Sequence, residues 1–326
     1  MITHRERLEA CLSDTTLDRV PIALWRHFPV DDQSPERLAR AVIEFQRRYE
    51  FDLVKVTPAS SFCIKAWGAQ DEWRAATEGT RDYINQVIQS PQDWGNLNEI
   101  DPLSGHLGDQ LECLKLLRQE FGDETPIIQT IFSPLSQAKN LVGKENLLIH
   151  LRRYPDALSE GLRRISETTQ RYVQAVQDTG VAGIFYAVQH AQYGLLSDAE
   201  FKRFCRPYDL DILHSADKMW LKLLHIHGRE VMFDNFTDYP VNIINWHDQE
   251  TAPALKEGKM RFPGVVCGGL RRYETMVLGA PEQVTAEAQA AIQATDGRRF
   301  ILGTGCVVPI TAPHGNILAA KHAVMR

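Results

Sequence analysis

The sequence lacks three features that would place the protein in a membrane, on a nucleic acid or in an oxidising compartment. No uncharged apolar run approaches the ~18 residues that a membrane-spanning helix needs. The 36 basic and 42 acidic residues are scattered and give a net charge of only -6. They form no basic patch for nucleic acid or an anionic membrane. The six cysteines form no close pairs, which favours free thiols over a disulfide framework.

The first residues also lack the apolar core of a signal peptide, because the segment from Met1 to Arg7 is charged. We therefore expect a cytoplasmic protein. A chain of 326 residues, 44% of them hydrophobic, can bury a large core. Since no linker, low-complexity segment or internal repeat divides it, we expect one domain over residues 1–326.

Two kinds of segment alternate along the chain. Eight short aliphatic or β-branched runs predict strands at residues 20–25, 53–57, 127–132, 183–188, 221–227, 241–246, 264–267 and 300–303. Segments with helical spacing lie between most of them, including residues 34–49, 109–120, 157–179, 198–218 and 281–294. Strand and helix in strict alternation imply right-handed crossovers and a parallel sheet. Eight such units favour a closed (β/α)8 barrel of the TIM type.

Residues that can bind metal follow the last four predicted strands. His225 and His227 end the fifth run two residues apart, so both side chains lie on one face. His247, Cys267 and Cys306 lie at the ends of the next three runs. In a TIM barrel the chemistry is found at these carboxyl ends, and neutral imidazole and thiolate are preferred zinc ligands.

We predict one zinc ion held by His225, His227 and Cys306, with a fourth position left open for catalysis. Cys267 is a weaker candidate, because an isolated cysteine is more often a small buried hydrophobe. We expect His247 to be a proton carrier that faces the substrate or a partner that orients a metal ligand.

Polar residues at the other strand ends indicate the kind of substrate. They are Gln189, His190 and Tyr193 after the fourth run, Arg26 and His27 after the first, and Lys55 near the end of the second. Together they suit a small anionic or zwitterionic molecule. Arg26 would hold a carboxylate, with His190 or Tyr193 as hydrogen-bond donor, and His190 is with His247 a candidate catalytic residue. The alternative for each is a solvated loop residue.

Four segments resemble the uroporphyrinogen decarboxylase superfamily. They read "THRERLEACLSDTTLDRVPIALW", "SPLSQAKNLVGKENLLIHL", "GLLSDAEFKRFCRPYDLDIL" and "FILGTGCVVPITAPHGNILAA", and they occur in the family's order. The resemblance covers nearly the whole chain and implies a barrel. The superfamily includes metal-free decarboxylases and zinc-dependent methyltransferases that pass a methyl group from a corrinoid protein to a thiol such as coenzyme M.

The chain departs from the decarboxylase pattern. That branch carries two arginines four residues apart after the first strand, whereas here Arg26 is followed by Val30. The second strand is followed by Pro58, Ala59 and Ser60, where the family has an aspartate. A tetrapyrrole with several carboxylates needs several cations, so we do not expect uroporphyrinogen decarboxylation.

The methyltransferase branch carries His-x-Cys after the fifth strand and a cysteine in a Gly-Cys turn of the eighth. His225 and Cys306 match that pattern, and His227 stands where the family has cysteine. With two imidazoles and one thiolate, zinc keeps one positive charge. A thiolate bound to it becomes a poorer nucleophile, and the metal becomes better at polarising a carbonyl or activating water.

The resemblance and the residues together predict a zinc-dependent methyltransferase with a methylcorrinoid as co-substrate and a small thiol or soft acceptor. A corrinoid protein is the expected partner. A metal-dependent lyase or hydrolase on the same scaffold stays open, as does a non-catalytic role as corrinoid partner or metallochaperone. The oligomeric state is also open, with a homodimer as one alternative.

Overall fold

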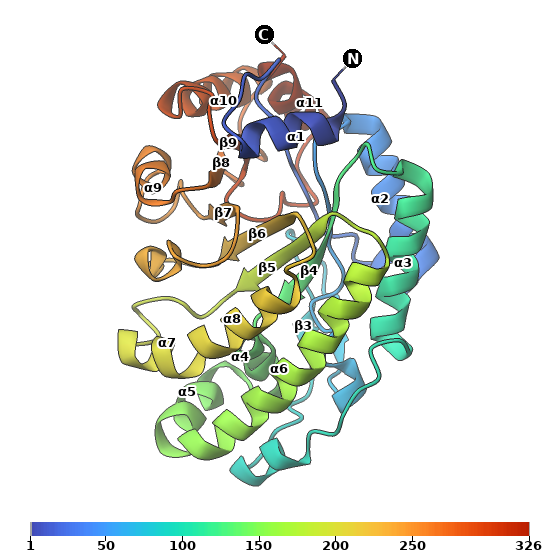
Figure 1. Ribbon diagram of the computed structural model, residues 1–326, viewed down its shortest axis with the longest axis vertical. Coiled ribbons are helices and arrows are strands. Elements are labelled where there is room, and N and C mark those ends of the chain that lie inside the picture. Colours follow the sequence, from blue (N-terminus) through green and yellow to red (C-terminus); the bar gives the residue numbers. More distant parts are fainter. Residues whose placement is uncertain (1, 326) are drawn as a thin grey trace.

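A computed structural model describes residues 2–325 (Figure 1). Its main sheet has seven parallel strands in the order β1-β4-β5-β6-β7-β8-β9. Their bounds are β1 Val54–Val56, β4 Ile127–Phe132, β5 Gly183–Val188, β6 Leu221–Ile226, β7 Ile243–Trp246, β8 Val265–Leu270 and β9 Phe300–Thr304. The short strands β2 (Asp71–Glu72) and β3 (Asp82–Tyr83) form a separate antiparallel pair. The sheet is curled, and helices cover its outer side (Figure 1).

The prediction of eight strands in a closed barrel is met only in part, because the first predicted run, residues 20–25, is not a strand. It makes one isolated parallel bridge, between Ile22 and Leu302 of β9. Ile22 also accepts a hydrogen bond from the backbone of Asp52, just before β1. Pro21 has no N–H to donate, which weakens regular pairing along this segment. The other seven predicted runs coincide with strands of the sheet.

Eleven α-helices are found within residues 2–325, and they include all five predicted helical segments. Residues 198–218, predicted as one helix, form two helices that meet at Cys205. Pro207 lies in the first turn of the second, where a missing N–H is tolerated but the first helix cannot continue. The bounds are α1 His4–Leu12, α2 Pro35–Tyr49, α3 Gly105–Phe121, α4 Pro134–Val142, α5 Lys144–Arg153, α6 Pro155–Asp178, α7 Asp198–Phe204, α8 Arg206–Ser215, α9 Leu255–Arg261, α10 Pro281–Ala294 and α11 His314–Ala323.

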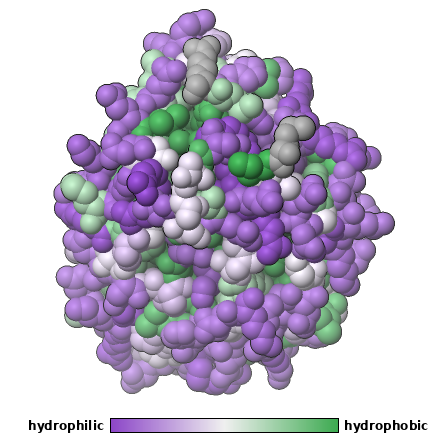
Figure 2. Space-filling model, turned by 45° about the horizontal axis from the view of Figure 1, so that its top comes forward, coloured by the Kyte–Doolittle hydropathy of each residue, from purple (hydrophilic) through white to green (hydrophobic). Residues whose placement is uncertain are grey.

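The apolar residues gather between the sheet and its helices. One cluster of buried hydrophobic side chains runs through the described chain from Leu8 to Val324. The face drawn in Figure 2 is mostly hydrophilic, with apolar side chains in small separate patches. No helix within residues 2–325 is both long and apolar enough to cross a membrane.

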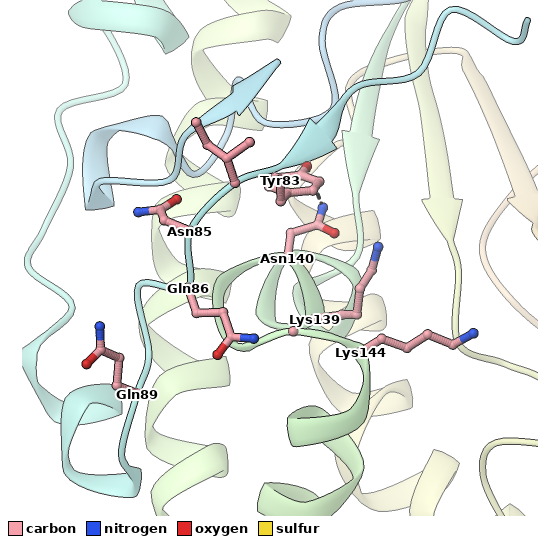
Figure 3. Close-up of a pocket in the computed structure, with 9 residues that line it drawn as sticks. Tyr83, Asn85, Gln86, Gln89, Lys139, Asn140 and Lys144 are labelled. Atoms are coloured by element: carbon pink, nitrogen blue, oxygen red, sulfur yellow. Dashed lines mark hydrogen bonds between the residues drawn. The ribbon is translucent and has the colours of Figure 1, made fainter. Parts of the chain in front are cut away.

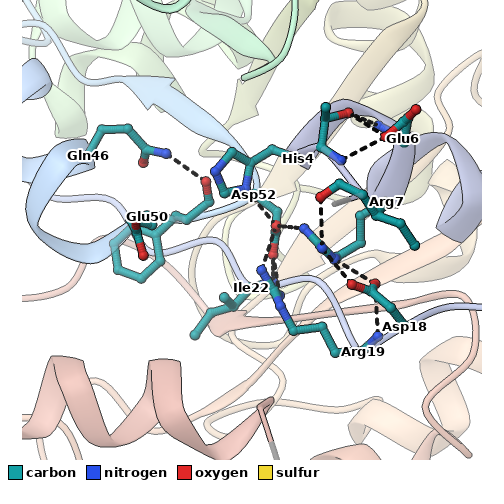
Figure 4. Close-up of polar contacts among 12 residues, drawn as sticks. His4, Glu6, Arg7, Asp18, Arg19, Ile22, Gln46, Glu50 and Asp52 are labelled. Atoms are coloured by element: carbon teal, nitrogen blue, oxygen red, sulfur yellow. Dashed lines mark hydrogen bonds and ion pairs between the residues drawn. The ribbon is translucent and has the colours of Figure 1, made fainter.

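A buried carboxylate fixes α1 to the amino end of the sheet (Figure 4). The side chain of Asp52, which precedes β1, is fully buried and accepts hydrogen bonds from Arg7 at 2.8 Å and Arg19 at 2.7 Å. It also contacts Nδ1 of His4 at 2.9 Å and accepts from the backbone N–H of Ile22 at 2.8 Å. A buried carboxylate is tolerated where cations and donors surround it in this way.

Candidate metal centre and active site

Four side chains that can bind metal converge at the carboxyl ends of the strands. His225 and His227 come from the end of β6, His247 follows β7, and Cys306 follows β9. One donor atom from each lies within 4.8 Å of the other three. The parallel register places His225 beside Asn245, so β6 and β7 each present alternate residues to the same interior face.

The distances in this cluster suit tetrahedral zinc. Nε2 of His247 lies 3.2 Å from Nδ1 of His227, and Sγ of Cys306 lies 3.7 Å from the same Nδ1. Nitrogen and sulfur ligands bound at roughly 2.0–2.3 Å with tetrahedral angles are themselves about 3.3–3.8 Å apart. The spacing of Cys306 and His227 therefore fits two of the predicted ligands, and His247 lies close enough to be a further ligand.

The hydrogen bonds of Asn245 determine which nitrogen of His225 is free. The Asn245 amide donates to the backbone oxygens of Cys267, at 2.8 Å, and Thr304, at 3.0 Å. Its Oδ1 is therefore the atom that faces Nδ1 of His225, at 2.7 Å. Because an amide oxygen only accepts, Nδ1 of His225 carries the proton and Nε2 has the lone pair. That Nε2 is buried without a partner among the described residues, as a metal ligand would be.

A network of charged side chains orients the ring of His247. Nδ1 of His247 lies 3.3 Å from a carboxylate oxygen of Glu250. Glu250 also accepts from Arg272 at 3.3 Å, and Arg272 donates to Glu78 at 2.7 Å. The carboxylate keeps the Nδ1 proton on the ring and directs Nε2 toward the other three side chains of the cluster. This arrangement is compatible with a proton carrier and with a residue that supports the metal.

The thiol of Cys306 has the electrostatics of a metal ligand. Burial raises its pKa, but the surrounding imidazoles of His225, His227 and His247 outweigh burial and hold the pKa well below its usual value. A thiolate is the form that binds metal.

A cavity of about 270 Å³ opens beside the cluster, and His225, His227 and Cys306 form part of its wall. Three of the residues predicted to bind substrate, His27, Lys55 and Gln189, also line it. The volume lies just below the usual range of roughly 300–1,000 Å³ for small-molecule sites.

Lys55 is the residue in this cavity with the clearest chemical role. Its Nζ donates to the hydroxyl of Thr57 at 3.2 Å and lies 4.5 Å from the centre of the Phe185 ring. Within residues 2–325 it forms no ion pair. Burial lowers the pKa of Lys55 to about 7, and an anion bound nearby would favour its charged form.

Two further histidines near the cavity are neutral. Burial, with a smaller effect of Lys55, lowers the pKa of His27 to about 3. Burial, then the charge of Lys139, lowers the pKa of His190 to about 3. Nδ1 of each ring is buried without a partner among the described residues. His190 is not part of the cavity wall, so its predicted role stays a prediction.

Three predicted residues lie apart from the cluster and the cavity. The guanidinium of Arg26 stacks on Phe28 and Phe45, at 5.3 and 5.9 Å from their ring centres. Tyr193 is 55% exposed. Cys267 is fully buried, and burial raises the pKa of its thiol, in keeping with a small hydrophobe.

The roles of Asn245 and of the ion-pair network of Glu250, Arg272 and Glu78 were not predicted from the sequence. Asn245 lies two residues before His247, so strand alternation places both on the interior face next to His225 and His227. That signal was present in the sequence. The contacts of Arg272 with Glu250 and Glu78 join residues that are far apart in the chain, and no local pattern could indicate them.

A family model for uroporphyrinogen decarboxylase (URO-D) matches residues 3–326. The chain belongs to this family. Relatives include the methylcobamide:CoM methyltransferase MtbA of Methanosarcina mazei, 22% identical over 97% of this chain and 95% of that protein. MtaA of Methanosarcina barkeri is 21% identical over 97% and 96%. The uroporphyrinogen decarboxylase of Corynebacterium diphtheriae is 24% identical over 86% and 82%.

Solved structures agree on the fold of this family member. A methyltransferase from Methanosarcina mazei superposes with a TM-score of 0.86 at 19% identity and covers 100% of this chain and 99% of that one. A B12-independent methionine synthase from Shewanella has a TM-score of 0.60 at 14% identity, over 93% and 91%. The family match over residues 3–326 confirms the predicted membership of the uroporphyrinogen decarboxylase superfamily, and the solved structures show the same fold.

Proposed function

We propose that this protein is a zinc-dependent methyltransferase that moves a methyl group from a corrinoid, or another methyl donor, to a small thiol or similarly soft acceptor. One observation carries the proposal: donor atoms of His225, His227, His247 and Cys306 gather within 4.8 Å beside a cavity. The methylcobamide:CoM methyltransferases among the relatives support the methyl-transfer chemistry.

In this proposal His225, His227 and Cys306 hold the metal. Zinc with an open position lowers the pKa of a bound thiol, so that its sulfur is nucleophilic near neutral pH. Asn245 keeps Nδ1 of His225 protonated and leaves its Nε2 free to bind. The thiolate of Cys306 offsets part of the metal's charge.

His247 would take the proton of the acceptor. Its Nε2 faces the cluster, and Glu250 at 3.3 Å from Nδ1 would stabilise the resulting imidazolium. The acceptor sulfur forms a bond to the methyl carbon as the bond from carbon to cobalt breaks, and that electron pair stays with the corrinoid. Lys55 would donate a hydrogen bond to an oxygen of the acceptor, because its buried ammonium has no carboxylate partner in the described chain.

A metal-dependent lyase or hydrolase is the second candidate. It is favoured by His227, since two imidazoles and one thiolate leave a positive charge on zinc that suits activation of water. The two candidates differ in products. A methylated thiol supports the first, whereas consumption of a small acid or ester without methyl transfer supports the second.

The test combines metal analysis with a methyl-transfer assay. The purified protein is expected to contain one zinc and to methylate members of a panel of small thiols with methylcobalamin as donor. His225→Ala should lose the metal and the activity together, whereas His214→Ala, an exposed histidine on α8, should keep both. Full zinc content in His225→Ala would refute the ligand assignment. Absence of any methylated thiol from the zinc-loaded wild type would refute the methyl-transfer proposal.

A further inference from the structure

A groove of about 700 Å³ adjoins the cavity of the candidate active site (Figure 3). One side is the segment of residues 83–89, and the other is the corner where α4 meets α5. Figure 3 shows Lys139 and Lys144 extending from this corner, with Asn140 directed toward Tyr83. Tyr83, Lys139 and Asn140 line both the groove and the cavity. A ligand that occupies both would therefore pass these three residues.

The groove is positively charged. Lys139 and Lys144 are its only charged lining residues, and within residues 2–325 neither forms an ion pair. Burial, and then the charge of Lys144, lowers the pKa of Lys139 to about 8. Helix α5 begins at this corner, and Gly143 provides no side chain to cap its free N–H groups. Two unpaired ammonium groups beside an uncapped helix start favour an anion.

Two buried amide oxygens along this path have no hydrogen-bond donor among the described residues. Asn140 is 5% exposed, and its side-chain amide donates to the hydroxyl of Tyr83 at 2.7 Å. Its oxygen has no partner among the described residues, and the same is true of the oxygen of Gln189 in the cavity. Buried amide oxygens are normally paired. A ligand that passes them would satisfy them with N–H or O–H groups.

From these observations we infer that the acceptor is an elongated thiol with a phosphate at its far end and amide or hydroxyl donors between the two. This inference rests on the proposed function. The sulfur lies at the metal centre, the donors pair with Gln189 and Asn140, and the phosphate lies at Lys139 and Lys144. A small thiol alone would leave the two lysines and both amide oxygens without partners.

The first test measures binding of inorganic pyrophosphate to the full-length protein by calorimetry, and it does not depend on methyl transfer. Lys144→Gln should weaken binding by roughly tenfold or more, as expected for loss of a charge-assisted hydrogen bond. Lys218→Gln is the matched control, because Lys218 is exposed and lies just before β6, at the opposite end of the sheet. No saturable binding to the wild type, or equal weakening in both variants, would overturn the inference.

The second test compares phosphopantetheine with pantetheine as acceptors, since they differ only in the phosphate. The wild type should have a lower KM for the phosphorylated thiol, and Lys144→Gln should lose that preference while it retains bound zinc. Equal KM values in the wild type would refute the elongated acceptor. If pyrophosphate binds as expected but no thiol is methylated, the proposed function fails and the anion site remains.

Discussion

Removal of the Asp52 carboxylate should cost more stability than removal of any exposed acid. Its side chain is fully buried between Arg7 and Arg19, so Asp52→Ala leaves Arg19 without a carboxylate partner and leaves Arg7 paired only with Asp18. Loss of one member of a buried ion pair costs about 3–5 kcal/mol. For 326 residues the entropy of unfolding is roughly 0.7 kcal/mol per kelvin, so the midpoint should fall by roughly 4–7 °C.

The assay is thermal unfolding near pH 7, followed by circular dichroism or calorimetry. Asp238→Ala is the control, because Asp238 pairs with Arg206 while 66% exposed and should contribute at most about 1 kcal/mol. Equal losses in the two variants would refute the assignment of Asp52 as the anchor of α1.

The effect of Asp52 should also depend on pH. Burial raises the pKa of Asp52, but His4, Arg19 and the Ile22 N–H outweigh it and hold the pKa well below its usual value. The carboxylate therefore stabilises the fold above about pH 4, where the unfolded chain is ionised, and this contribution is lost as the pH falls further. The stability difference between the wild type and Asp52→Ala should shrink toward pH 2. A difference that grows on acidification would contradict this reasoning.

Three further predictions follow from single contacts. Asn245→Leu should weaken zinc binding by roughly 10–100-fold in a chelator competition while the fold is kept, because His225 loses the group that orients it; unchanged affinity would refute that role. Gly183→Ala should lower the free energy of unfolding by more than about 4 kcal/mol in chemical denaturation, since the added Cβ would lie 1.5 Å from the Leu221 backbone oxygen. Gly95→Ala is the control and should lower it far less, because a Cβ there would have no atom within 4 Å. Burial raises the pKa of Asp209 to about 7, so the free energy of unfolding should decrease as the pH rises from about 4 to 7 and this acid ionises. Asp209→Asn should make the free energy of unfolding less dependent on pH in that range. An unchanged pH profile in the variant would count against this reasoning.

The sequence was sufficient to predict much of the fold and the gathering of His225, His227 and Cys306 at one edge of the sheet. Apolar runs located seven strands, and alternation along β6 placed His225 and His227 on one face. The run at residues 20–25 was as apolar as the others, but whether it pairs as a strand depends on the neighbouring backbone, which local sequence does not encode.

The substrate residues were harder to predict, because position near a strand end does not set the direction of a side chain. Arg26 and His27 are adjacent, yet His27 lines the cavity while Arg26 stacks on two phenylalanines. The groove beside Lys139 depends on how residues 83–89 cross the α4–α5 corner. No periodicity in either segment indicates that crossing.

The amide of Asn245 has a consequence for how the protein would respond to metal supply. It joins His225 on β6 to the backbone of both β8 and β9. The position of the His225 ring therefore depends on how these strands are placed relative to one another. By thermodynamic linkage, an ion that binds only the folded chain must raise its resistance to unfolding. Batches grown in depleted and replete medium should therefore differ in melting temperature, and strand contacts remote from the ligands should tune the affinity for the ion.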